Sequence, residues 1–401
     1  MESFDVVILG AGASGLFCAQ EAAARGLRVA VLEHSPKPGR KILISGGGRA
    51  NFTNLRVTPE NYVSMNPHFC KSALSRFTSA DFLDRIRQNG VRFVEKKHGQ
   101  LFCEGTAADL LGMLLDWCRR GKVDLRTSHE IRRVESGFTV ETNRGDFSAP
   151  RLVVATGGIS VPRSGASDLG YRIAKQFGHD LTPRTPALCG FTLGGSLATM
   201  VSALSGVSAP IELSTREGTF REDLLFTHWG ISGPAVLQAS LYWNPGEPLR
   251  IRFIPELDWG SRLWDLKAKK DNRPCRAVFQ EHLAERLVSA WFKHFELQSP
   301  TIQNLSASDA RTLHEAWTNW ELTPSDWIGW ERAEVTRGGV STTKISSKTM
   351  ESALAPGLYW IGEVLAARRW TGRSSTGPRP SRPPMPFEAP EQKTSGRSIQ
   401  V

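Results

Sequence analysis

The stretch that decides the fold is residues 5–15, which read DVVILGAGASG. The apolar run over 5–9 is typical of a buried strand, and it leads directly into the spacing G-x-G-x-x-G at Gly10, Gly12 and Gly15. The first glycine allows a tight turn, the second lets backbone approach a pyrophosphate, and the third lets the next helix lie against the strand. The amides at the start of that helix favour phosphate oxygens.

A second apolar run, residues 27–32, ends at Glu33, eighteen residues after Gly15. A carboxylate at the end of this strand accepts hydrogen bonds from ribose hydroxyls and disfavours a 2′-phosphate. A glycine turn alone is weak evidence, because such turns are common. Here a predicted strand, a predicted helix and the acid surround it, so the pattern predicts a Rossmann-type α/β domain that binds a dinucleotide through these glycines, Ala13, Ser14 and Glu33.

A second glycine-rich loop follows at 38–54, PGRKILISGGGRANFTN. Its basic and amide side chains suit a large anionic ligand, and its glycines let backbone approach a planar ring, although a solvated loop is the alternative. Residues 39–54 resemble the signature of bacterial FAD flavoproteins called aminoacetone-oxidase-like or BaiN-like NAD(P)/FAD-dependent oxidoreductases. The match departs at Ala50, where that family usually has Cys, which puts any thiol role there in doubt. The resemblance implies these cofactor residues: Arg40, Lys41, Ser45, Gly46, Gly47, Arg49 and Asn51.

The resemblance covers roughly residues 1–365 and implies further cofactor contacts. The further contacts lie in three predicted strands: the strand near residue 131, the strand that ends at residue 158, and an apolar strand near the end of the matched region, which ends in Gly-Glu. They are Ile131, Thr156, Gly157, Gly158, Gly362 and Glu363. The segment 223–235, DLLFTHWGISGPA, also matches the family, and in it His228 either faces a substrate or is held in the turn.

Together with the order of segments, the resemblance implies a discontinuous three-layer Rossmann-type FAD-binding domain with an insertion. Its first part is expected at 1–188 and its return segment at 351–372. A β-rich inserted domain is expected at 189–255 plus about 331–350, and a small helical subdomain with tryptophans in its core at 256–330. The proline-rich residues 373–401 lack apolar periodicity and are expected to be a disordered tail.

Composition narrows the functional classes. The chain has 401 residues and a formal net charge of +10, but residues 366–401 carry seven Lys and Arg against two Glu, so half of the surplus lies there and a nucleic-acid partner is not expected. Six cysteines without C-x-x-C spacing predict neither a metal site nor disulfides. No apolar run reaches the length of a membrane span and no signal peptide is recognised, so a cytoplasmic protein is expected.

The leading interpretation is an FAD-dependent oxidoreductase that transfers a hydride through flavin N5 between a small molecule and a nicotinamide or oxygen. No second G-x-G-x-x-G occurs, so NADH or NADPH would visit the flavin transiently. One alternative is a flavin-dependent RNA-modifying enzyme, which the basic balance allows. Another is a flavin binder with impaired or no catalysis, because the chain departs from the family after Leu365. The sequence identifies neither a catalytic base, the substrate nor an oligomeric state.

Overall fold

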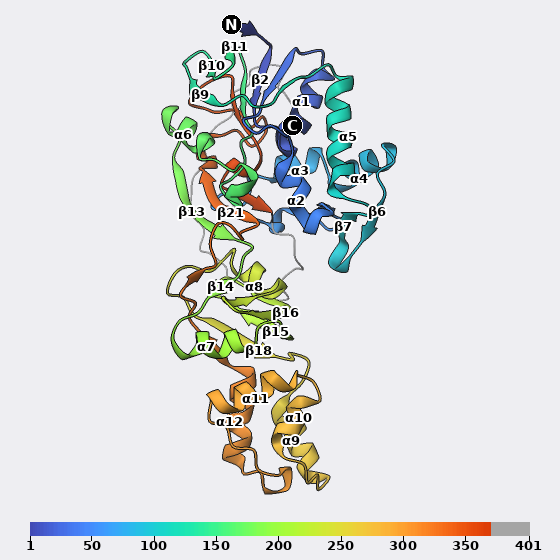
Figure 1. Cartoon of the computed structure of the whole chain (residues 1–401), viewed down its shortest axis with the longest axis vertical. Coiled ribbons are helices and arrows are strands. Elements are labelled where there is room, and N and C mark those ends of the chain that lie inside the picture. The colour runs from blue at the N-terminus through green and yellow to red at the C-terminus, as the bar shows by residue number, and fades with distance from the viewer. Residues whose placement is uncertain (370–401) are drawn as a thin grey trace. The chain divides into compact units, whose positions relative to one another are not determined.

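The computed structural model describes residues 1–369, which divide into two compact units (Figure 1). The first unit comprises 1–185 and the segment that begins at Glu334, and the second comprises 186–333. The predicted disordered tail at 373–401 and the last residues of the predicted return segment lie outside the described residues.

A five-stranded parallel sheet lies at the centre of the first unit. Its order is β22 (Leu358–Trp360), β12 (Leu152–Val154), β2 (Val6–Leu9), β3 (Val29–Leu32) and β8 (Asp124–Arg126). All residues of β2, β3 and β12 are buried, which explains why their sequences are continuous apolar runs rather than alternating ones. Strand β2 has β3 on one side and β12 on its other side. The order of the strands along the chain therefore reverses direction between β2 and β12. In open α/β sheets, ligands bind at such a point.

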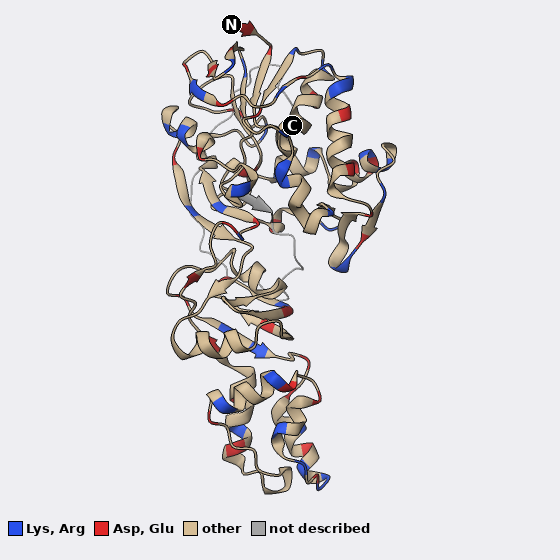
Figure 2. Cartoon of the chain, viewed as in Figure 1, with Lys and Arg blue, Asp and Glu red and all other residues tan. Residues whose placement is uncertain are grey.

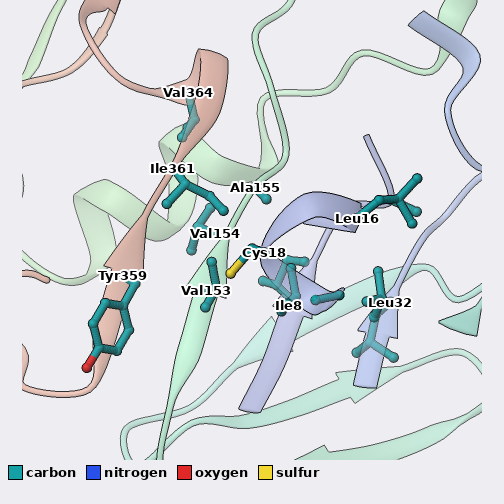
Figure 3. Packing of buried hydrophobic residues seen from close by; sticks show 14 of the residues in the cluster. Ile8, Leu16, Cys18, Leu32, Val153, Val154, Ala155, Tyr359, Ile361 and Val364 are labelled. Atoms are coloured by element: carbon teal, nitrogen blue, oxygen red, sulfur yellow. The ribbon is translucent and has the colours of Figure 1, made fainter. Parts of the chain in front are cut away.

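Helix α1 (Ala13–Ala23) packs its apolar side chains on this sheet (Figure 3). Ile8 of β2, Leu32 of β3 and Leu16 of α1 have no accessible surface, and burying a side chain of this size contributes about 1.5–3 kcal/mol. Cys18 lies in the same core, where burial raises the pKa of its thiol to about 12. All six cysteines are free and buried.

Smaller elements surround the central sheet. The other helices of the first unit are α2 (Arg40–Gly48), α3 (Lys71–Arg76), α4 (Ser79–Gln88), α5 (Ala107–Arg120) and α6 (Leu169–Gln176). A four-stranded sheet has the order β1 (Glu2–Ser3), β11 (Gly145–Ser148), β10 (Thr139–Thr142) and β9 (Ile131–Val134), and a three-stranded sheet has the order β4 (Asn51–Asn54), β7 (Gln100–Cys103) and β6 (Phe93–Glu95). Two further pairs are β5 (Tyr62–Ser64) with β23 (Ala367–Arg369), and β13 (Leu181–Ala187) with β21 (Val335–Val340).

The second unit is built on a seven-stranded sheet. The order is β19 (Trp320–Leu322), β18 (Leu249–Phe253), β15 (Ser208–Ser214), β16 (Thr219–Thr227), β17 (Gly230–Ser232), β14 (Phe191–Thr192) and β20 (Asp326–Trp327). Its helices are α7 (Gly195–Ala203), α8 (Pro234–Ala239), α9 (Trp259–Ala268), α10 (Cys275–Gln280), α11 (Glu285–His294) and α12 (Ala307–Thr318). The last four are the helices between residues 259 and 318. Trp259, Trp291 and Trp317 are fully buried there, as expected for a tryptophan core, whereas Trp264 is 43% exposed.

The segment 334–350 belongs to the first unit, whereas the sequence pattern assigned about 331–350 to the inserted domain. Strand β21 pairs with β13, and Thr336 Oγ1 accepts hydrogen bonds from the amides of Ile159 and Ser160 at 2.8 and 3.0 Å. These partners lie far away in the sequence, so local periodicity carried no sign of them. Within residues 1–369, no helix is both long and apolar enough to cross a membrane.

Candidate cofactor site

A cavity of about 410 Å³ opens at the carboxyl ends of β2, β3 and β12, inside the first unit. Its volume is typical of small-molecule sites. Its wall brings together most of the predicted cofactor residues, which come from six separate stretches of the chain: Gly10, Gly12, Ala13, Ser14, Glu33, Arg40, Lys41, Ser45, Ile131, Thr156, Gly157, Gly158, Gly362 and Glu363.

The glycine turn shapes one end of the cavity. Gly10 has φ +104°, and a Cβ there would lie 2.7 Å from the carbonyl oxygen of Ala155; a Cβ on Gly15 would lie 1.9 Å from the carbonyl oxygen of Gly10. Both positions therefore require glycine for packing. Gly12 differs, because its φ of −83° is ordinary and a Cβ there would meet no atom within 4 Å. Since Gly12 also lines the cavity and no side chain caps α1, the helix start is open to an anionic ligand.

Glu33 is held rigidly at the end of β3 in the cavity wall. Its Oε2 accepts a hydrogen bond from the Ala11 amide at 2.9 Å, and its Oε1 accepts one from the Ser35 amide at 2.8 Å. The side chain is buried, so these bonds compensate for the lost hydration of the carboxylate. Oε2 has a second lone pair with which it can accept a hydrogen bond from a ribose hydroxyl, whereas His34 Nδ1 lies 3.1 Å from Oε1.

Lys41 and Glu363 form a polar network on another side of the cavity. Lys41 Nζ donates to Ser160 Oγ at 2.8 Å and to Glu363 Oε2 at 2.9 Å, while Glu363 Oε1 accepts from the Thr336 amide at 2.9 Å. The network connects α2, the segment after β12, β21 and the return segment. A Cβ on Gly158 would lie 2.8 Å from Glu363 Oε1, so the backbone of the Thr-Gly-Gly turn packs closely on this carboxylate.

The charge around the cavity is mainly basic on the α2 side. Lys37, Arg40 and Lys41 line it, whereas elsewhere Lys and Arg are interspersed with Asp and Glu over the described elements (Figure 2). Glu334 also borders the cavity. Its side chain is exposed at the cavity, but the protein packed around it partly removes water and so raises the pKa of its carboxyl above the usual value.

Five predicted cofactor residues lie outside the cavity wall: Gly15, Gly46, Gly47, Arg49 and Asn51. The expected loop at 38–54 is instead largely helix α2, whose regular conformation is interrupted from Ser45 to Gly47 before β4 begins at Asn51. Arg49 Nη2 donates to the carbonyl oxygen of Glu104 at 2.7 Å. A cofactor role for these residues stays a prediction.

Sequence reasoning did not select several other residues of the wall. They include His34, Ser35, Lys37, Ser164, Ser167 and Glu334. His34, Ser35 and Lys37 lie within the four residues after Glu33, and Arg40 Nη2 donates to the Arg163 carbonyl at 2.6 Å, next to Ser164. The only sequence feature that could have indicated Ser164 and Ser167 was their position shortly after the Thr-Gly-Gly strand. Among residues 1–369, no group of three or more His, Cys, Asp or Glu side chains is placed to hold a metal ion.

The helix start, the acid at the end of β3 and the open face of Gly12 fit an ADP moiety such as that of FAD, so fold and cavity define a Rossmann-type dinucleotide-binding protein. Residues 4–373 match the family described as HI0933-like protein Rossmann domain. The chain belongs to this family of flavin oxidoreductases, and its α/β FAD-binding fold carries an inserted β-rich domain.

Three relatives span nearly the whole chain. The ribosomal RNA dihydrouridine synthase of Escherichia coli (strain K12) is 44% identical over 93% of this chain and 94% of its own length. The ribosomal RNA dihydrouridine synthase of Haemophilus influenzae is 41% identical over 91% of this chain and 93% of its own. The 3-dehydro-bile acid delta(4,6)-reductase of Clostridium scindens is 29% identical over 89% of this chain and 92% of its own length.

Proposed function

We propose that this protein is an FAD-dependent ribosomal RNA dihydrouridine synthase, which reduces the C5–C6 double bond of a uridine in ribosomal RNA. The observation that carries the proposal is the 44% identity to such an enzyme over 93% of the chain. The relatives favour the RNA-modifying alternative over the leading interpretation of the sequence, in which the substrate is a small molecule. RNA is therefore proposed as the substrate, in place of the expectation that nucleic acid is not a partner. Ribosomal RNA as substrate would place the reaction in the cytoplasm.

The residues of the cavity have separate tasks in this proposal. The amides at the start of α1 bind the pyrophosphate, with Gly12 providing space, and Glu33 accepts the hydroxyls of the adenosine ribose. Gly157, Gly158 and Gly362 offer backbone to the remaining length of the cofactor. Lys41 and Ser160 hold the carboxylate of Glu363 in place by hydrogen bonds. The carboxylate can there accept hydrogen bonds from the hydroxyls of the ribityl chain.

The net reaction adds one hydride and one proton across the uracil double bond. A reduced nicotinamide supplies the hydride and leaves oxidised, and the proton comes ultimately from water. Bound FAD would supply the hydride-transferring N5 of its ring. Glu334 is the acid of the cavity whose pKa is raised, so it is the group we assign to holding a proton there.

The test begins with the visible spectrum of the purified full-length protein and its bleaching by NADH and NADPH in separate anaerobic cuvettes. The protein is then incubated with ribosomal RNA from cells that lack the homologous gene, and dihydrouridine is measured by nucleoside mass spectrometry. Appearance of dihydrouridine only with protein and reduced nicotinamide supports the proposal. A protein that binds flavin and is bleached, yet forms no dihydrouridine in any ribosomal RNA, contradicts it.

A small-molecule reductase is the second candidate function, and the bile-acid reductase relative favours it. This candidate predicts oxidation of the reduced nicotinamide by an unsaturated ketosteroid without RNA. Purified protein that stays colourless and gains no flavin absorbance with added FAD would instead indicate the non-catalytic alternative. The three outcomes are therefore distinguished with one preparation.

A further inference from the structure

The hairpin between β16 and β17 in the second unit ends in a loop of two residues, His228 and Trp229. Thr227 pairs with Gly230 across the loop, and Thr227 Oγ1 donates to the Gly230 carbonyl at 3.0 Å. A Cβ on Gly230 would lie 2.1 Å from the carbonyl oxygen of Phe191, so the base of the hairpin packs tightly against β14. The end of the hairpin is therefore held at a fixed place on the sheet.

The loop carries an exposed indole flanked by two polar side chains. Trp229 has 50% of its surface exposed. The guanidinium carbon of Arg332 lies 5.9 Å from the centroid of the indole ring, and the His228 ring lies 4.6 Å from it at an interplanar angle of 41°. Within residues 1–369, neither the Arg332 guanidinium nor the His228 ring has a hydrogen-bond partner. Whether His228 faces a substrate or is held in the turn stays open.

This composition is unusual for a two-residue hairpin loop. Such loops favour Gly, Asn and Asp, because their backbone matters more than their side chains. Here two large rings extend from the loop without becoming buried, and a cation lies beside them. A tryptophan face next to a guanidinium with free donors is the combination that stacks a nucleobase and contacts its phosphate.

We infer that His228, Trp229 and Arg332 form a platform on which an unpaired base of the RNA substrate stacks. This inference rests on the proposed function, since it concerns the substrate of that reaction. An unpaired base exposes its π-face, whereas a base inside a duplex is covered by its neighbours, so the platform selects single-stranded segments. The Arg332 guanidinium can contact a phosphate while the exposed ring stacks on a base, and RNA presents these two groups together.

A second exposed tryptophan provides the matched control. Trp264 on α9 is 43% exposed, and Lys267 Nζ lies 5.3 Å from its ring centroid. That lysine already donates to the Leu305 carbonyl at 2.5 Å. Trp264 therefore has similar exposure but a neighbouring cation that is already engaged.

The experiment compares full-length wild-type protein with Trp229→Ala, Trp229→Phe and Trp264→Ala. The probe is a short fluorescein-labelled single-stranded RNA of mixed sequence, alone and annealed to its complement, followed by fluorescence anisotropy. Loss of one stacked base should weaken single-strand binding by about 5- to 100-fold in Trp229→Ala. Trp229→Phe should keep most of the affinity, and Trp264→Ala should equal wild type.

Turnover on ribosomal RNA separates a platform from a general structural effect. For Trp229→Ala, KM for the RNA should rise by a similar factor, while kcat and the bleaching of flavin by reduced nicotinamide stay unchanged. If wild type forms dihydrouridine and Trp229→Ala has the same KM and RNA affinity, the platform is refuted and the proposed function stands. If wild type forms no dihydrouridine, the proposed function fails and the platform fails with it.

Discussion

Lys41 Nζ lies 2.9 Å from Glu363 Oε2, although 322 residues separate the two in the chain. Lys41 belongs to α2, and Glu363 belongs to the segment that returns after the entire second unit. The pair therefore joins the beginning and the end of the cofactor-binding unit at the cavity wall. Its two side chains retain 32% and 24% of their exposure, so water screens the pair only in part.

Replacing Lys41 by Met should loosen this wall. Glu363 would lose its cation while it keeps the Thr336 amide, and we expect unfolding to require about 1–2 kcal/mol less free energy and FAD to bind about tenfold more weakly. Chemical denaturation and titration with FAD measure the two effects. Arg87→Met is the control, because its pair with Asp84 is exposed at 58% and 61% and should change stability by about 0.5 kcal/mol or less. Equal losses in both variants would argue against a special role of Lys41.

Replacing Glu33 by Ala should lower both stability and FAD affinity. The amides of Ala11 and Ser35 would lose their acceptor in a buried place, which costs about 1–3 kcal/mol for each unpaired group. Glu33→Gln retains one acceptor oxygen and should therefore be the more stable of the two variants. Both should bind FAD at least about tenfold more weakly than wild type. Unchanged FAD affinity in Glu33→Gln would remove the carboxylate from the proposed set of ligands.

His179 should make the protein sensitive to acid. The ring is buried, its Nε2 lies 2.8 Å from Ser352 Oγ, and its Nδ1 has no partner within residues 1–369. Burial lowers the pKa of the imidazole below its ordinary value of 6.5, although the neighbouring Asp180 opposes the shift. The folded state therefore binds fewer protons at His179 than the unfolded state. The free energy of unfolding is fully present above the pKa that His179 has in the unfolded chain, and it decreases as the pH falls through the lower pKa of the folded state.

Thermal unfolding between about pH 8 and about pH 5 tests this expectation. The melting temperature of wild type should fall as the pH drops below the ordinary pKa of histidine. In His179→Gln, which keeps a polar group near Ser352, the fall should be smaller. Parallel pH profiles for the two proteins would show that other groups dominate the acid response.

Much of the first unit could be predicted from local pattern. Gly10, Gly12 and Glu33 follow from strand, turn and spacing rules, because the chemistry of a pyrophosphate and a ribose fixes those positions. Ile131 and Gly362 could be selected only through the resemblance, since their sequences alone read as ordinary strand ends. All five lie in the cavity wall.

The parts that the sequence missed depend on contacts between distant segments. Glu334 borders the cavity because β21 pairs with β13, and no local period in 331–350 indicates that partner. Arg49 Nη2 donates to the Glu104 carbonyl, a contact that its charge alone did not indicate, and its cofactor role stays a prediction. In both cases tertiary packing decided which groups the side chain lies beside.

The two glycines of the turn should respond to substitution in opposite ways. Gly10→Ala should destabilise the fold, because φ is +104° there and the new Cβ would lie 2.7 Å from a backbone oxygen. Gly12 has φ −83° and ψ −172°, an extended conformation that Val adopts readily, and its Cβ position is free of protein atoms. Gly12→Val should therefore fold with an unchanged melting temperature.

Equilibrium titration of flavin-free wild type and Gly12→Val with FAD, followed by flavin fluorescence, tests the central claim that FAD binds in this cavity with its pyrophosphate at the start of α1. The account predicts an equally stable Gly12→Val protein that binds FAD at least about a hundredfold more weakly, because the valine side chain occupies the space of the pyrophosphate. A Gly12→Val protein that binds FAD as tightly as wild type would contradict it.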